Sequence, residues 1–286
     1  MTTVPAASHP PPPEHPELPD GVAARRLPPP WPAWTAPAAL LAGFAGATVV
    51  AILIGVVGSA FGGSLTDPPP AVSISAVVGQ DLCLIGAVLL FARMVARPEP
   101  WQFGLQPPAN VRASVGYVVA GYLGFLLFSY LWLLAIGQPD TKDTVIQDLG
   151  ADKSTVALVA ATAVVTILAP LSEEFFFRGY FFGALRRKGL WVAAGLTGLA
   201  FGLVHVFGSP IAFIVPLAAL GTLLCLLRER TGSLYPGIVL HCINNAAAMS
   251  SSEHWSWQVP IALFGSLAAI ALLLRLSLNV WRRSLA

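Results

Sequence analysis

Charge is scarce in this chain of 286 residues, because Asp, Glu, Lys and Arg together make up only 10% of it. An average soluble domain is about 25% charged, whereas 56% of this chain is apolar and its mean hydropathy is +0.72. This composition predicts an integral membrane protein whose surroundings are the lipid bilayer. The net charge of +2 is too small to indicate a protein that binds nucleic acid.

Cysteine is also rare. The three cysteines, Cys83, Cys225 and Cys242, each lie in an apolar run, and none belongs to a CxxC pair. That spacing argues against a disulfide framework and against a zinc site built from thiolates. We expect free thiols that face lipid or the protein core.

Proline is unevenly distributed, and its distribution divides the chain. Residues 1–37 hold 12 of the 25 prolines. A segment so rich in proline cannot form a helix, so we expect a disordered, proline-rich cytoplasmic tail. The remaining residues, 38–286, are expected to form one transmembrane helical domain.

Long apolar runs predict an all-α fold, a polytopic membrane protein with about eight transmembrane helices. A helix needs about 17 to 25 apolar residues to cross the hydrocarbon core of a bilayer. Such runs, two of them short and rich in glycine, cover residues 38–61, 71–96, 112–137, 154–185, 191–207, 210–228, 233–250 and 258–281.

Lys and Arg are concentrated in alternate connections between these runs. Cytoplasmic loops of membrane proteins carry an excess of basic residues. With the N-terminus inside, 13 of the 16 basic residues fall on the cytoplasmic side, and only Lys142 and Lys153 fall outside. The remaining one, Arg178, lies within a span. This asymmetry predicts that both termini are cytoplasmic.

A few strongly polar residues remain inside the apolar runs, although a charge at the bilayer centre costs several kcal/mol. The helical rise of about 1.5 Å per residue gives the depth of each residue in the membrane. By this measure, four of them lie about 17 to 25 Å from the cytoplasmic edge: Glu173, His205, His241 and Asn245. Polar residues of three spans at one depth can converge, and they predict a polar cavity in the middle of the membrane. The full set of strongly polar residues inside the apolar runs is Asp81, Glu173, Glu174, Arg178, His205, His241 and Asn245.

Helical spacing separates the two glutamates of the segment SEEFFFRGYF, residues 172–181. Glu174 and Arg178 are four residues apart and can neutralise each other, whereas Glu173 points about 100° away from that pair. We therefore expect Glu173 to be the carboxylate that is free for chemistry, and the Glu174–Arg178 pair to support it.

The fifth and seventh runs each carry their polar residues on one face. His241 and Asn245 are four residues apart, so the imidazole and the amide lie one above the other. In the fifth run, small residues at helical spacing lead to a histidine and predict close contact with a neighbouring helix. They are Gly195, Gly198, Gly202 and His205.

Each of these residues also has a purely structural interpretation. A single histidine inside a membrane is usually a hydrogen-bonded packing residue, and a Glu–Arg pair can be a structural ion pair. The shared depth and the inward faces favour a functional site instead. Asp81 stands apart, and for it we expect a hydrogen bond between helices rather than a catalytic role.

The order of the polar residues resembles the CPBP family, the membrane proteases that include the CAAX prenyl endopeptidases and the bacteriocin-processing (Abi) proteins. The resemblance covers about residues 154–250, and it implies an intramembrane endopeptidase of a bacterial plasma membrane that cleaves a membrane-associated peptide or protein. The three motifs that carry it are Glu173-Glu174-x-x-x-Arg178, Phe201-x-x-x-His205 and His241-x-x-x-Asn245.

The resemblance also implies a role for each motif residue. Glu173 and His205 would activate a water molecule, and His241 and Asn245 would bind the developing oxyanion of the scissile carbonyl. Amide hydrolysis needs such a base and such donors. Glu173, His205 and His241 also match the ligand types of a catalytic zinc site, but no HExxH segment occurs. The choice between a zinc enzyme and a metal-free one stays open.

Two other functions stay open as well. The chain could be a non-catalytic membrane scaffold or immunity factor of the same family, or it could carry a small solute or protons. The absence of an evident repeat between the two halves of the sequence argues against a transporter. The sequence does not identify the substrate or its cleavage site.

Overall fold

A computed structural model describes residues 29–64, 67–252 and 258–283. The structure is 82% helical, and no strand occurs among the residues it describes, which confirms the all-α prediction. The α-helices are α1 (Thr35–Ala60), α2 (Pro70–Val95), α3 (Pro100–Phe103), α4 (Val111–Ala135), α5 (Val145–Asp148), α6 (Thr155–Ala163), α7 (Ala169–Glu173), α8 (Phe182–Leu185), α9 (Leu190–Val204), α10 (Ile214–Thr231), α11 (Tyr235–Ser252) and α12 (Gln258–Arg283).

Short segments of other helical types join or extend several of these helices. Two are π-helices, η2 (Val164–Leu168) and η3 (Glu174–Phe181). The others are 3-10 helices: η1 (Ala151–Lys153), η4 (Arg186–Lys188), η5 (His205–Phe207) and η6 (Ile211–Phe213).

Seven of the eight predicted spans are confirmed as helical segments long and apolar enough to cross a membrane. The remaining one, the seventh run at 233–250, forms the helix α11, but this helix is not apolar enough to count as a membrane span by composition. Its sequence explains the difference, because it carries His241, Asn244 and Asn245 and ends in three serines. The chain is therefore an integral membrane protein in which α11 is the most polar of the eight long helical segments.

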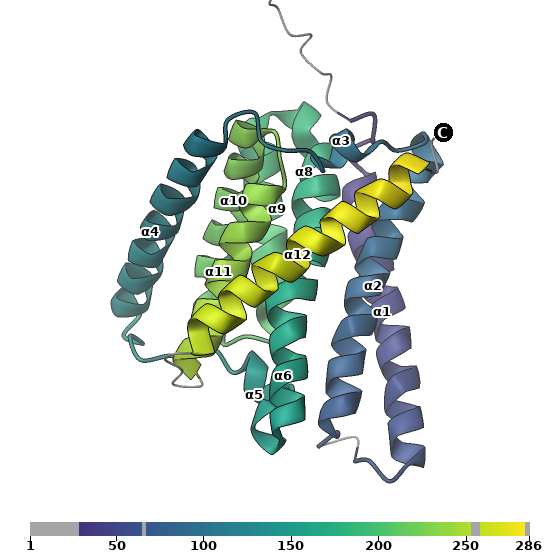
Figure 1. Ribbon diagram of the computed structural model, residues 1–286, viewed down its shortest axis with the longest axis vertical. Coiled ribbons are helices and arrows are strands. Elements are labelled where there is room, and N and C mark those ends of the chain that lie inside the picture. The colour runs from purple at the N-terminus through teal and green to yellow at the C-terminus, as the bar shows by residue number, and fades with distance from the viewer. Residues whose placement is uncertain (1–28, 65–66, 253–257, 284–286) are drawn as a thin grey trace, which may run out of the picture.

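Some helices adjacent in the sequence pack side by side, but α4 packs mainly against α10 and α11 rather than against α2 or α6 (Figure 1). The two most closely packed pairs are α1 with α2 and α9 with α10, while α4 lies outside α10 and α12 crosses the bundle diagonally. The start of α1 and the end of α12 lie at the same end of the bundle, near α3 and α8. This arrangement agrees with an even number of crossings; the cytoplasmic location of both ends stays a prediction.

The fourth span is one continuous helical segment, Thr155–Lys188, that contains two π-helical stretches, η2 and η3. Proline has no N–H group and its ring collides with the preceding helical turn, so a proline inside a helix forces a local adjustment. Pro170 is the second residue after η2, and the N–H of Ala169 bonds to Val164 O, five residues back. The wider π turn accommodates the proline without ending the helix.

The last residues of the predicted tail pack against the helical bundle. The sequence predicted a disordered tail over residues 1–37, of which residues 1–28 lie outside the described range. Trp31, however, is only 1% exposed, and its ring contacts those of Phe103 and Tyr180 at centroid distances of 4.8 Å. Burial of this indole holds the chain against η3, and α1 begins at Thr35 despite the nearby prolines.

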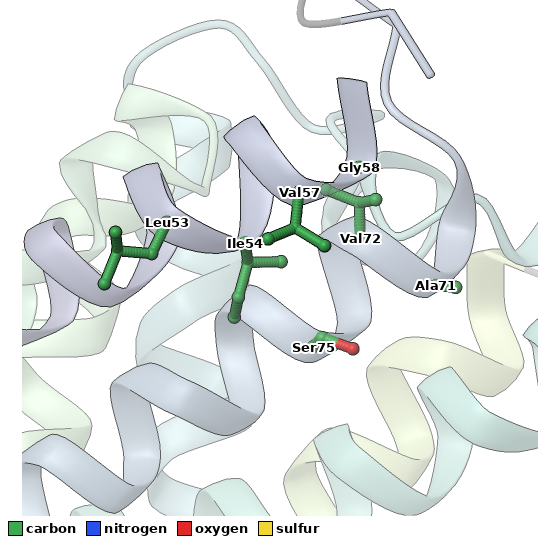
Figure 2. A pocket seen from close by; sticks show the side chains of 7 residues that line it. All are labelled: Leu53, Ile54, Val57, Gly58, Ala71, Val72 and Ser75. Atoms are coloured by element: carbon green, nitrogen blue, oxygen red, sulfur yellow. The ribbon is translucent and has the colours of Figure 1, made fainter. Parts of the chain in front are cut away.

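A shallow groove of about 400 Å³ lies along the contact between the end of α1 and the start of α2. Figure 2 shows that its walls are apolar side chains with a single hydroxyl, that of Ser75. None of the polar residues predicted to form a site lines this groove. It is a feature of the lipid-facing surface and offers no groups for catalysis.

The contact between α9 and α10 depends on the glycine face predicted from the sequence. A Cβ atom added at Gly198 would lie 2.5 Å from the carbonyl oxygen of Ala218 and 2.7 Å from the backbone nitrogen of Thr222. At Gly202 it would lie 2.6 Å from Ile214 O. Gly195, one turn earlier, has nothing within 4 Å. Only part of the glycine face therefore touches the neighbouring helix.

Gly198→Ala should lower the free energy of unfolding by about 1 to 3 kcal/mol, the usual effect of overpacking. Gly195→Ala is the matched control and should be at least as stable as wild type, because alanine favours the helix. Thermal unfolding of the purified protein in detergent measures both. Equal unfolding temperatures for the two variants would show that the close approach at Gly198 is unimportant.

Candidate active site

The predicted polar residues are carried by three parts of the bundle that are in contact. Glu173 ends α7 and Glu174 begins η3, so the two glutamates lie where the winding of the helix changes. His241 lies on α11, which packs against α7 and η2. His205 is the first residue of η5, directly after α9.

Glu174 and Arg178 form the predicted ion pair. The Nη1 atom of Arg178 donates to Oε1 of Glu174 at 2.7 Å, and both side chains are completely buried. The guanidinium also lies 4.2 Å from the ring centroid of Phe201, on α9. Arg178 therefore neutralises Glu174 and joins the fourth span to α9 through a cation–π contact.

His241 lies between the two glutamates. Its Nδ1 atom is 3.0 Å from Oε1 of Glu174, and its Nε2 atom is 3.7 Å from Oε2 of Glu173. Gly237, one turn earlier, permits this approach, because a Cβ atom there would lie 2.9 Å from Oε2 of Glu174. The buried Glu174 carboxylate thus orients the imidazole, so that its second nitrogen faces Glu173.

Glu173 differs from Glu174 in its surroundings. Its side chain is 16% exposed, whereas that of Glu174 is fully buried. Its Oε2 atom has no hydrogen-bond partner among the described residues, and the Nε2 atom of His241, 3.7 Å away, lies beyond hydrogen-bond distance. Glu173 is therefore the glutamate available to react.

His205 is held by its own helix. Its Nδ1 atom lies 2.7 Å from the carbonyl oxygen of Phe201, and a carbonyl can only accept, so Nδ1 carries the proton. In the neutral imidazole, Nε2 is then an acceptor. The Phe201 ring contacts both imidazoles, at centroid distances of 4.7 Å to His205 and 5.8 Å to His241. Within the described part of the chain, no hydrogen bond or ion pair joins His205 to Glu173 or His241.

Asn245 has a structural bond that the sequence did not suggest. Its Nδ2 atom donates to the carbonyl of Val165 at 2.9 Å. In a π-helix that carbonyl would accept from the residue five positions later, which is Pro170 and has no N–H group. Asn245 satisfies the oxygen instead, and its amide retains a second N–H for another acceptor. Pro170, three residues before Glu173, is the one feature of the sequence that could have indicated this contact.

The three residues predicted as zinc ligands do not come together as a set. Among the described residues, no group of three His, Cys, Asp or Glu side chains is close enough to hold a metal ion. The structure brings Glu173 within 3.7 Å of His241, while no hydrogen bond or ion pair joins His205 to either of them among the described residues. The choice between a zinc enzyme and a metal-free one stays open.

Asp81 lies beside this cluster, on α2. Its Oδ1 atom accepts a hydrogen bond of 2.8 Å from the hydroxyl of Ser172, the residue before Glu173. The carboxyl is 1% exposed. The hydrogen bond between helices predicted for Asp81 is confirmed, while its position next to Glu173 could not be predicted, because no periodicity relates distant helices.

The fold and the site together define a class, the polytopic all-α membrane proteins with a buried centre of carboxylates and imidazoles. A family model described as type II CAAX prenyl endopeptidase Rce1-like matches residues 155–247, the part that contains all three motifs. An uncharacterized 24.3 kDa protein of Escherichia coli is 30% identical over 161 residues, which are 55% of this chain and 70% of that protein. No solved structure matches.

The chain belongs to the Rce1-like family. It is a membrane protein of the CAAX-protease type, and the structure brings both glutamates of the first motif to His241 of the third.

Arg178→Ala should lower the free energy of unfolding by about 3 to 5 kcal/mol, because it leaves the buried Glu174 charge without its partner. The double variant Glu174→Gln with Arg178→Met removes both charges and should recover much of that loss. Thermal unfolding and the yield of folded protein measure the effect. An Arg178→Ala protein of wild-type stability would show that the pair contributes little to folding.

Proposed function

We propose that this chain is an intramembrane endopeptidase that hydrolyses a peptide bond of a membrane-associated protein or peptide. The observation that supports it most strongly is the position of His241, which is bonded to the neutralised Glu174 and faces the partly exposed Glu173. A structural ion pair needs only one glutamate. A second glutamate next to the imidazole supplies a proton acceptor.

Glu173 would act as the general base. It takes a proton from a water molecule while the water oxygen forms a bond to the scissile carbonyl carbon. When the C–N bond breaks, Glu173 returns that proton to the leaving amine, so the carboxylate is regenerated. Glu174 is unsuited to this role because its side chain is fully buried and its Oε1 atom is engaged by Arg178 and His241.

His205 would anchor the attacking water. Its Nε2 atom is an acceptor once Nδ1 donates to Phe201, so it can receive a hydrogen bond from water. This role follows the family resemblance, and the tautomer deduced from the Phe201 contact is the one that it requires. The water would then be held by two acceptors, Glu173 and His205.

His241 and Asn245 would stabilise the oxyanion. The Nδ1 atom of His241 donates to the Glu174 carboxylate, so donation to an oxyanion requires a second proton on Nε2. Asn245, one turn later, has an N–H that Val165 does not use. Donors placed where negative charge develops usually contribute about 100- to 1,000-fold in rate each. A water-filled approach to these groups through the bilayer is a further expectation of this proposal.

Glu173→Gln preserves the shape of the side chain but removes the proton acceptor. It should abolish cleavage, while the protein still inserts, folds and binds its substrate. A reporter peptide for this assay would come from comparing membrane peptides of cells with and without the protein, and cleavage would be measured in proteoliposomes. Near wild-type cleavage by Glu173→Gln would contradict the proposal and favour a non-catalytic member of the family.

The order of the other variants tests the division of roles. His205→Ala should be about as severe as Glu173→Gln, because the water loses its second anchor. Asn245→Ala should lower kcat by about 100- to 1,000-fold, as expected for one oxyanion donor, and His241→Ala should lower it at least as much. A folded Asn245→Ala protein as inactive as Glu173→Gln would exclude this assignment.

Metal dependence is a separate question, and the mechanism above uses no metal. Cleavage by the purified protein should survive treatment with a strong chelator, and elemental analysis should find no zinc in proportion to protein. Stoichiometric zinc, with activity that is lost on chelation and restored by zinc, would show that Glu173 or the histidines bind metal.

A further inference from the structure

Asp81 is a buried carboxyl group that the proposed mechanism does not use. It is 1% exposed and lies in the middle of α2, one of the apolar spans. Its Oδ1 atom accepts from Ser172, and its Oδ2 atom is buried without a hydrogen-bond partner among the described residues. A carboxyl group with an unsatisfied oxygen is costly in such a place. Its presence needs an explanation beyond packing.

The contact of Asp81 leads directly to Glu173. Ser172 is the neighbour of Glu173 in the last turn of α7, immediately before the winding changes to that of a π-helix. The Ser172 hydroxyl is also 3.1 Å from the carbonyl of Ala169. Its single proton is therefore shared between the helix backbone and Asp81. This hydroxyl fixes the rotation of the turn that carries Glu173 relative to α2.

Among the residues that the structure describes, none forms an ion pair with Asp81. On the fourth span the nearby charged residues are Glu173, Glu174 and Arg178, and Arg178 is paired with Glu174. Asp81 is close enough to Glu173 for the two carboxyl groups to interact electrostatically. Like charges repel, so a structural ion pair does not account for Asp81, whereas a fixed contact with Ser172 does.

We infer that Asp81 is a positioning residue for the general base, and that it acts through Ser172 to hold Glu173 at the Nε2 side of His241. The inference rests on the proposed function of Glu173. A displacement of a reacting group by about 1 Å can cost about 100-fold in rate. The Asp81–Ser172 contact therefore affects the catalytic step more than the binding of substrate.

The test compares kcat and KM for the reporter peptide in proteoliposomes. Asp81→Ala and Ser172→Ala should each lower kcat by about 10- to 100-fold, with KM changed less than about twofold. The double variant should be no worse than the more severe single one, because both remove the same contact. Asp81→Asn should retain most of the activity, because its amide oxygen still accepts from Ser172.

Ser266→Ala is the matched control. The hydroxyl of Ser266 on α12 makes a buried hydrogen bond of 2.7 Å with Thr166, so this variant also loses a buried contact between helices. It should lower the unfolding temperature about as much as Ser172→Ala, but leave kcat close to wild type. Thermal unfolding of each variant in detergent confirms that losses of kcat are not losses of folded protein.

Several results would overturn the inference. A folded Asp81→Asn protein as inactive as Asp81→Ala would show that the ionisable carboxyl itself is required. Wild-type kcat in Asp81→Ala and Ser172→Ala, additive losses in the double variant, or an equal loss in Ser266→Ala would also contradict it. If Glu173→Gln cleaves normally in the same assay, the proposed function fails, whatever the Asp81 variants do.

Discussion

The Oε1 atom of Glu174 is the point on which this site depends, because it accepts from both Arg178 and His241. A buried carboxylate is tolerable in an apolar bundle only if its charge is balanced. Arg178 balances the charge, and His241 gains a fixed orientation from the same atom. One ion pair therefore makes a second glutamate available for chemistry and aims an imidazole at it.

The backbone supports this arrangement by departing from regular α-helix. The π stretch η2 accommodates Pro170 and leaves the carbonyl of Val165 for Asn245. The glycines serve a related purpose, since Gly237 admits the Glu174 carboxylate and Gly198 lets α10 approach α9. The π-helical winding thus explains Pro170 and Asn245, and the close contacts between helices explain Gly198 and Gly237.

Much of this could be predicted from the sequence, and the limits have physical causes. Apolar length identified the helices to within a few residues, and the spacing of Glu174 and Arg178 identified their pair, because both are properties of a single helix. The position of His241 between two glutamates was not predicted, since it depends on how two helices pack. The same is true of Asp81. The π-helices were missed because their hydrogen bonds, rather than any periodicity, define them.

The central claim is that Glu174 sets the active geometry by orienting His241, and the most direct test is the cleavage rate of Glu174→Gln under single-turnover conditions in proteoliposomes. The account predicts that this variant binds the reporter peptide as wild type does but cleaves it on the order of 100-fold more slowly or worse, as when a carboxylate that orients a catalytic histidine becomes an amide. Cleavage at the wild-type rate by a folded Glu174→Gln protein would contradict the claim.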